Sequence, residues 1–309
     1  MPIQTVNRLL TFLLVDGHLL RVSIRGEGPP LLLVMGLGGN IEMWDPLERA
    51  LNGHGVQTIA YDASGTGHSP TRLVPQRMPG LARQAAHLLD ALGHPSADVL
   101  GVSYGGAVAQ ELTLGNPHRL RRLVLASTTC GLGGVPGNPL AMSLLATPLR
   151  YYSPAFLRLT AGILYGPTIS GKEGLLRAQI NARRARPPTL WGYASQLAAG
   201  AGWTSLPWLG RIAAPTLVLA GDRDPIVPAR NARLLARRIP AARLEVVPGA
   251  GHLLLVDQAE HCAAVIADFL HGESTRGDDR GPEEASVLSP RRGRASRTGR
   301  QRAAASGPG

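Results

Sequence analysis

The sequence predicts an α/β fold with a doubly wound, mostly parallel sheet, helices on both of its faces and an inserted helical lid. Continuous apolar runs recur along the chain, and stretches of helical character separate them. Runs without polar alternation are typical of parallel strands that are covered on both faces. Their alternation with helices indicates a doubly wound sheet. The chain has 309 residues, of which 44% are hydrophobic and only 4% aromatic, so its large core must be mainly aliphatic.

The first predicted element is a hairpin. Two apolar runs flank Asp16-Gly17, a dipeptide that tolerates the positive φ of a tight turn. Further strands are expected at residues 30–35, 56–61, 97–102, 123–126, 216–220 and 244–247. Helices are expected between and after them, at residues 44–51, 80–92, 104–114, 229–238 and 258–270.

One interval interrupts this alternation. Residues 130–208 contain no clear strand, and Gly and Pro separate short apolar helices. Loops in compact domains have a median length of about 4–6 residues, so this interval must be an inserted structure. We expect a helical lid there, on a core formed by residues 1–129 and 209–271. Residues 272–309 are rich in Gly, Arg and Ser and cannot bury enough apolar surface to fold, so we expect a disordered tail.

The formal net charge of +11 favours nucleic-acid binding only at first sight. Nearly all of the positive charge is arginine, Lys172 being the single lysine, which indicates a compositional bias. Much of it lies in the tail, and no basic stripe interleaved with aromatic residues is present. We therefore do not expect nucleic-acid binding as the main function. A tail that binds an anionic surface or a granule partner stays an alternative.

Cysteine usage and the N-terminus bear on the compartment. Cys130 and Cys262 show no metal or C-x-x-C spacing, and two reduced, buried thiols are favoured over a single disulfide. The apolar run from Leu9 to Val15 is shorter than the roughly 20 residues that span a bilayer. It also lacks a basic preceding segment and a cleavage site. We expect no transmembrane segment, no metal and a cytoplasmic protein; the sequence does not indicate an oligomeric state.

A candidate nucleophile lies in Gly101-Val102-Ser103-Tyr104-Gly105, which fits the G-x-S-x-G pattern. The motif follows a predicted strand and precedes a predicted helix, the setting that this pattern requires. The turn is so sharp that the residues two before and two after the serine must lack side chains. We expect Ser103 to be the nucleophile; the alternative is a glycine-rich turn with an idle serine.

A serine hydroxyl needs a base, and the base needs an orienting acid. Asp224 follows the strand at 216–220, and His252 follows the strand at 244–247, so both are expected at the carboxyl edge of the sheet. The chain order Ser, acid, His is the one that this fold requires. Asp222 is the alternative acid. Five other histidines are expected on the surface or in packing: His68, His87, His94, His118 and His261.

Ester chemistry also needs donors for the developing oxyanion. We expect the backbone N–H of Tyr104 and that of Leu37, in the glycine-rich loop at residues 35–39, to supply them. A phosphate-binding role for this loop is disfavoured, because it lacks the Walker spacing and its lysine. The second glycine-rich turn, from Asp62 to Ser69, is interpreted as structural, with these two side chains bonding to the backbone.

The motifs together resemble a known family. The serine turn, the Gly-Asp-x-Asp-Pro-Ile-Val-Pro stretch at residues 221–228 and Gly251-His252 resemble the α/β-hydrolase superfamily. Three further stretches are similar to intracellular medium-chain-length poly(3-hydroxyalkanoate) depolymerases: Met35-Gly36-Leu37-Gly38-Gly39-Asn40 with Trp44, Gly134-Val135-Pro136-Gly137-Asn138-Pro139, and Gly202-Trp203-Thr204-Ser205-Leu206-Pro207-Trp208-Leu209.

This resemblance covers residues 31–270 and places the acid at Asp224. It implies hydrolysis of the ester bonds of a storage polyester of 3-hydroxy fatty acids at a granule surface. The Arg-rich tail departs from the family pattern, and so does Tyr104, where tryptophan is expected.

We therefore expect a cofactor-free carboxylic-ester hydrolase that works through an acyl-enzyme. Alternatives on the same triad are a small-molecule esterase, a lactonase and a C–C bond hydrolase. Dehalogenase and epoxide hydrolase activities are disfavoured because Ser103 stands where those enzymes have aspartate. A ligand-binding protein without turnover is disfavoured, since binding alone does not need all three residues of the triad.

Overall fold

The computed structural model describes residues 8–272, apart from the side chain of Ser170, and the predicted fold class is confirmed. The sheet has the order β1-β2-β4-β3-β5-β6-β7-β8. Strand β2 is antiparallel to both of its neighbours, β1 and β4; from β4 to β8 all neighbouring strands are parallel. The strands are β1 Arg8–Val15, β2 His18–Arg25, β3 Pro30–Val34, β4 Gln57–Tyr61, β5 Ala97–Val102, β6 Leu120–Ala126, β7 Thr216–Gly221 and β8 Ala242–Val247. The part of the predicted tail that follows Gly272 lies outside the described residues.

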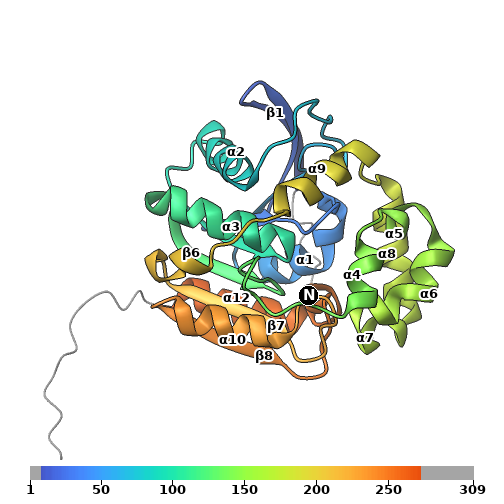
Figure 1. The fold of residues 1–309 in the computed structure, drawn as a ribbon. Coiled ribbons are helices and arrows are strands. Elements are labelled where there is room, and N and C mark those ends of the chain that lie inside the picture. Colours follow the sequence, from blue (N-terminus) through green and yellow to red (C-terminus); the bar gives the residue numbers. More distant parts are fainter. Residues whose placement is uncertain (1–7, 273–309) are drawn as a thin grey trace, which may run out of the picture. The chain divides into compact units, whose positions relative to one another are not determined.

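Helices cover both faces of the sheet, as the alternation predicts (Figure 1). On one face lie α2 (Met78–Ala91), α3 (Tyr104–Gly115) and α10 (Ala229–Arg238). On the other lie α1 (Asp45–Gly53) and α12 (Ala259–His271). The shorter elements are η1 Ile41–Trp44, η2 Pro117–Arg119, η3 Leu206–Arg211 and α11 Leu254–Asp257.

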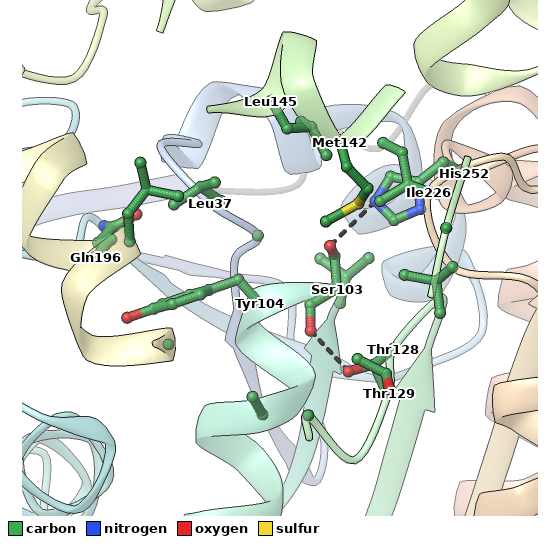
Figure 2. Close-up of a pocket in the computed structure, with 18 of the residues that line it drawn as sticks. Leu37, Ser103, Tyr104, Thr128, Thr129, Met142, Leu145, Gln196, Ile226 and His252 are labelled. Carbon is green, nitrogen blue, oxygen red and sulfur yellow. Dashed lines mark hydrogen bonds between the residues drawn. The ribbon is translucent and has the colours of Figure 1, made fainter. Parts of the chain in front are cut away.

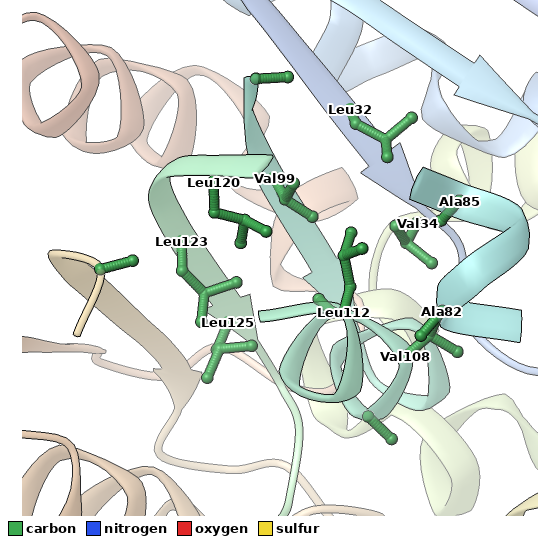
Figure 3. Close-up of a cluster of buried hydrophobic side chains, with 14 of the residues drawn as sticks. Leu32, Val34, Ala82, Ala85, Val99, Val108, Leu112, Leu120, Leu123 and Leu125 are labelled. Atoms are coloured by element: carbon green, nitrogen blue, oxygen red, sulfur yellow. The ribbon is translucent and has the colours of Figure 1, made fainter. Parts of the chain in front are cut away.

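Strand β3 shows why its sequence has no polar alternation. Leu32 and Val34 enter the core against α2 and α3, which Figure 3 shows. Leu31 and Leu33 point the other way, into the core that includes α1 and α12. These four residues of the strand are thus in an apolar environment, and the glycine-rich loop after it begins where this burial ends.

The predicted hairpin is also confirmed. Val15 pairs with His18 across the two-residue turn, and both turn residues have positive φ, 52° at Asp16 and 68° at Gly17. This geometry matches the strand twist and is the reason for the Asp-Gly dipeptide.

Between β6 and β7 the chain forms a helical insertion: α4 Pro139–Leu145, α5 Leu149–Tyr152, α6 Pro154–Tyr165, α7 Pro167–Ser170, α8 Glu173–Ala185 and α9 Leu190–Gly200. It contacts the loops that leave the carboxyl ends of the strands. The hydroxyl of Tyr151 donates to the carbonyl of Leu37 (2.6 Å), and the N–H of His252 donates to the carbonyl of Tyr165 (3.0 Å). The insertion therefore covers the edge of the sheet where α/β sites form.

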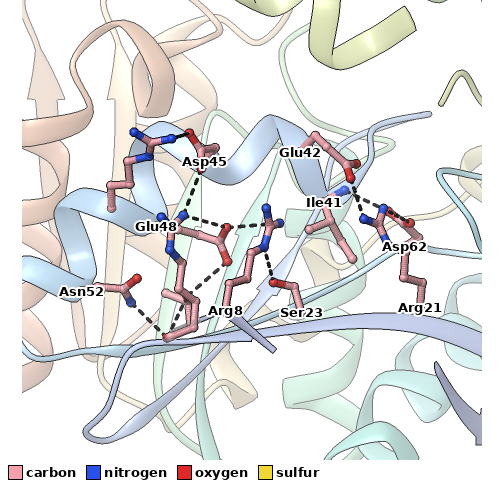
Figure 4. Close-up of polar contacts among 12 residues, drawn as sticks. Arg8, Arg21, Ser23, Ile41, Glu42, Asp45, Glu48, Asn52 and Asp62 are labelled. Atoms are coloured by element: carbon pink, nitrogen blue, oxygen red, sulfur yellow. Dashed lines mark hydrogen bonds and ion pairs between the residues drawn. The ribbon is translucent and has the colours of Figure 1, made fainter. Parts of the chain in front are cut away.

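The Asp62 turn is structural, as predicted. One carboxylate oxygen of Asp62 accepts from the N–H of Ile41 (2.8 Å) and the other from the N–H of His68 (2.9 Å). The Ser69 hydroxyl donates to the Asp62 carbonyl (2.7 Å), and Arg21 lies 3.4 Å from the carboxylate (Figure 4). Burial raises the pKa of Asp62, although these donors act in the opposite direction. Because Ile41 follows the glycine-rich loop after β3, this carboxylate also fixes that loop.

Replacing Asp62 with alanine is expected to destabilise the protein by about 3 kcal/mol, since it leaves the N–H groups of Ile41 and His68 without their acceptor and removes one of the two carboxylates that pair with buried Arg21. Urea denaturation measures this loss. Asp90→Ala is the matched control: its carboxylate pairs with Arg119 but its side chain is 56% exposed, so a change below about 1 kcal/mol is expected. Equal losses in the two variants would contradict a structural role for the buried turn.

Both cysteines are free and buried, as expected. Burial raises the pKa of the Cys262 thiol to about 12 and also raises that of Cys130. Neither thiol is therefore available as a thiolate nucleophile near neutral pH. Among residues 8–272, no helix has the length and apolar character needed to cross a membrane.

Candidate active site

Ser103 lies on a strained turn between β5 and α3, with φ of 54°. The requirement for glycine on either side is confirmed. A Cβ at Gly101 would lie 2.4 Å from the carbonyl oxygen of Gly105, and one at Gly105 would lie 2.0 Å from that of Val34. The close packing of α3 on β3 and β5 therefore holds the serine above the end of the sheet.

Three predicted residues meet in one hydrogen-bonded chain. His252 Nε2 lies 3.0 Å from Ser103 Oγ (Figure 2), and His252 Nδ1 lies 2.7 Å from Asp224 Oδ2. The other carboxylate oxygen, Asp224 Oδ1, accepts from the N–H groups of Ile226 and Val227, both at 2.9 Å. Asp224 and His252 are buried. In this arrangement His252 can accept the serine proton while Asp224 holds the opposite ring nitrogen.

Asp222, the alternative acid, has another partner. Its carboxylate accepts from the N–H of Gly249 at 2.7 Å and is exposed. It thereby braces the turn that precedes His252. The structure brings Asp224 rather than Asp222 to the imidazole.

The insertion fixes the histidine loop from the other side. Besides the hydrogen bond from His252 N to the Tyr165 carbonyl, the two rings are nearly parallel, with an interplanar angle of 14° and centroids 6.5 Å apart. A Cβ at Gly251 would lie only 1.8 Å from the same carbonyl oxygen. Glycine is thus required before His252 because the backbone of α6 approaches so closely.

Gly251→Ala is therefore expected to move the histidine loop, to lower kcat about 100-fold and to cost about 1–3 kcal/mol of stability. Steady-state kinetics on a soluble ester and thermal denaturation test this. Gly174→Ala is the control, because a Cβ there meets nothing within 4 Å. We expect it to keep full activity and to be as stable or slightly more stable in helix α8. Full activity in Gly251→Ala would show that the contact does not position His252.

The two predicted oxyanion donors both border the candidate site. Leu37 and Tyr104 line the same cavity as Ser103. In the part of the chain that the structure describes, neither backbone N–H donates to a protein acceptor. Both are therefore free to bind a substrate oxygen. The Tyr104 hydroxyl has no protein partner among residues 8–272, and burial raises its pKa, so it stays a neutral group.

Side chains of the insertion fix the loop that contains Leu37. Gln196 accepts from the N–H of Gly38 at 2.8 Å, and Arg150 and Tyr151 donate to the carbonyl of Leu37 at 3.0 and 2.6 Å. Because that carbonyl faces the insertion, these bonds set the direction of the neighbouring peptide groups. No motif in the sequence indicated these three residues.

The cavity above Ser103 has a volume of about 600 Å³, within the range of small-molecule sites. Its lining is mostly apolar, and Figure 2 shows several of these side chains around the serine. They include Met35, Leu37, Met43, Met142, Leu145, Leu197, Trp203, Ile226, Val227 and Leu253. Such a wall suits an aliphatic acyl or alcohol group.

Residues 134–137, from the stretch at 134–139, form part of this wall. Asn231 of α10 holds it, since its amide accepts from the N–H of Val135 and donates to the Val135 carbonyl, both at 2.8 Å. A Cβ at Gly137 would lie 2.1 Å from the Ile226 carbonyl oxygen. The chain thus needs glycine here to pass beside the loop that carries Asp224.

Comparison with known proteins agrees with this architecture. The profile of the alpha/beta hydrolase family matches residues 31–267. The chain belongs to the α/β-hydrolase family. It is 42% identical to a poly(3-hydroxyalkanoate) depolymerase of Ectopseudomonas oleovorans over 85% of this chain and 92% of that protein. These findings identify this α/β hydrolase as an enzyme, a serine hydrolase.

Two further relatives of the hydrolase differ in their names. A 3-oxoadipate enol-lactonase 2 of Acinetobacter baylyi is 30% identical over 76% of this chain and 86% of that protein. The solved structure of a hydrolase from Pseudomonas aeruginosa is 31% identical, with a TM-score of 0.73, and covers 85% of this chain and 98% of that one. Within residues 8–272, no cluster of His, Cys, Asp or Glu side chains is arranged to hold a metal ion.

Proposed function

We propose that this α/β hydrolase cleaves carboxylic esters through an acyl-enzyme formed on Ser103. The observation that carries the proposal is the hydrogen-bonded chain from Asp224 through His252 to Ser103, which opens into an apolar cavity. Ser103 Oγ attacks the ester carbonyl while His252 takes its proton and passes it to the leaving alcohol. Water then attacks the acyl-enzyme with the same base, which releases the acid and restores the serine.

The negative charge of each tetrahedral intermediate falls on the former carbonyl oxygen. The N–H groups of Leu37 and Tyr104 bind this oxygen, a contribution of about 2.7–4 kcal/mol for one such donor in mutational tests. Asp224 holds the imidazole in the tautomer that leaves Nε2 free to accept the serine proton. No cofactor takes part in this scheme.

We propose a polyester of medium-chain 3-hydroxy acids as the substrate. The 42% identical relative is named a poly(3-hydroxyalkanoate) depolymerase, and the aliphatic cavity suits the alkyl side chains of medium-chain units. The helical insertion acts as a lid in this proposal. Some of its apolar residues, including Tyr151, Leu157 and Leu164, are buried, but others are exposed and form a surface for a water-insoluble granule. The exposed ones are Leu140, Met142, Leu149, Tyr152, Leu159, Ile163, Leu190, Trp191 and Leu197.

A second candidate is hydrolysis of a small ester or lactone on the same triad, which the 30% identity to an enol-lactonase favours. The test is hydrolysis of a medium-chain polyhydroxyalkanoate latex by the wild type and by Ser103→Ala, with p-nitrophenyl octanoate in parallel. Serine-dependent clearing of the latex supports the depolymerase. Serine-dependent cleavage of the soluble ester without clearing excludes the polymer and retains the small-ester hydrolase.

A further inference from the structure

Two arginines lie in the wall of the cavity, and their burial is unusual for this residue type. Arg150 of α5 is 4% exposed, and Arg183 of α8 is 2% exposed. Both line the same cavity as Ser103 and His252. We call Arg150 and Arg183 the arginine pair.

Within residues 8–272, neither guanidinium forms an ion pair with a carboxylate. Arg150 donates to neutral groups, among them the Tyr193 hydroxyl and the Leu37 carbonyl. In the same part of the chain, Arg183 donates only to the carbonyl and the side-chain oxygen of Gln179, and its Nε has no partner there. A guanidinium stays protonated in a protein, so the wall carries two buried positive charges without a counterion. Burying a charge in this way is costly unless an anion arrives.

Aromatic rings lie between the Arg183 guanidinium and His252. The Arg183 guanidinium lies 5.1 Å from the ring centre of Tyr165 and 5.9 Å from that of Tyr151. The Tyr165 ring is in turn 6.5 Å from the His252 ring. The Tyr165 ring is common to the first and the last of these distances. The Arg183 guanidinium therefore lies no farther from the His252 ring than the sum of the Arg183–Tyr165 and Tyr165–His252 distances. An anionic group of a small ester bound at Ser103 can reach that distance.

We infer that the arginine pair binds a carboxylate of the substrate, so that the site selects esters with a free carboxyl group close to the scissile bond. Arginine is suited to this task because its planar donors match a carboxylate, and Arg183 still has donors free. The inference rests on the proposed ester hydrolysis and makes its substrate class narrower. In an oligomer of 3-hydroxy acids, such a bond is the last one at the carboxyl end. Its cleavage by water releases one hydroxy acid, whose new hydroxyl receives its proton from His252, and leaves an oligomer shortened by one unit.

The test compares two dimers of 3-hydroxyoctanoate, one with a free carboxyl end and one with a neutral carboxamide in its place. The wild type is expected to prefer the acid by about 10- to 100-fold in kcat/KM, the range of a charge-assisted contact. Arg183→Met is expected to lower this acid-to-amide ratio by the same factor, mainly through KM, and Arg183→Lys to restore part of it. Arg184→Met is the matched control, since Arg184 is exposed on the same helix and should leave the ratio as in the wild type.

Binding separates this inference from the proposed chemistry. Titration calorimetry on Ser103→Ala, which needs no turnover, is expected to show tighter binding of the acid dimer than of the amide dimer by at least about 10-fold. Equal binding, or equal kcat/KM in the wild type, overturns the carboxylate site whatever the fate of the triad. If Arg183→Met fails to fold, the acid-to-amide comparison in the wild type and in Ser103→Ala decides alone. If the wild type does not hydrolyse p-nitrophenyl octanoate, the proposed function is contradicted instead.

Discussion

Replacing Ser103 with alanine is expected to lower kcat for p-nitrophenyl octanoate by roughly 10⁶-fold, the loss found when the nucleophile of a triad is removed. The variant keeps Leu37 and Tyr104, so a small residual rate from oxyanion binding remains. Its fold should be intact, because alanine meets the same positive φ as serine and only the hydroxyl is lost. Steady-state kinetics measures this loss, and the acyl-enzyme that mass spectrometry detects in the wild type should be absent from the variant.

Two further variants test whether the loss of activity is due to Ser103 acting together with His252. Ser127→Ala is the matched control, since Ser127 is also buried with a positive φ of 43° but does not line the cavity; we expect full activity. The double variant Ser103→Ala with His252→Ala should be no slower than either single variant, because the two residues act as one unit. Multiplied losses would mean that His252 acts on something other than Ser103.

Most of the fold follows from patterns that are local in the sequence. The apolar runs, the Asp-Gly turn and the helical periodicity predict the strands, the hairpin and the helices to within a few residues. The order of the strands in the sheet is harder to predict from the sequence. That β3 lies between β4 and β5 depends on which sheet edges the connecting helices leave open, and no single segment encodes it.

In the candidate site, too, some residues can be predicted from local sequence patterns and others cannot. Ser103, Asp224 and His252 could be found because each lies in the loop or turn that follows a strand, and the carboxyl ends of parallel strands meet. The requirement for glycine at position 251 could not be predicted, because it depends on the carbonyl of Tyr165, which is far away in the sequence. The same holds for Gln196, Arg150 and the other insertion residues: helical periodicity predicts which face is buried, but not which polar group it will meet.

Replacing Asp224 with asparagine is expected to lower kcat about 10⁴-fold while leaving the fold in place. The reason lies in the orientation of the new amide. Its oxygen will take the place of Oδ1, which accepts from the N–H groups of Ile226 and Val227, so its NH₂ group must face His252. The Nδ1 atom must then accept a proton instead of donating one, which puts the ring proton on Nε2. An imidazole in that tautomer cannot take the proton of Ser103.

Asp222→Asn tests whether this effect belongs to one carboxylate. The amide oxygen at 222 can still accept from the N–H of Gly249, so we expect less than about a 10-fold change in kcat. Activity of both variants should be followed from pH 5 to 10, since an Asp224→Asn enzyme with the wrong tautomer stays slow across the range. If Asp222→Asn were the slower variant, the acid of the triad would be Asp222, and the hydrogen bond from His252 to Asp224 would have no role in turnover.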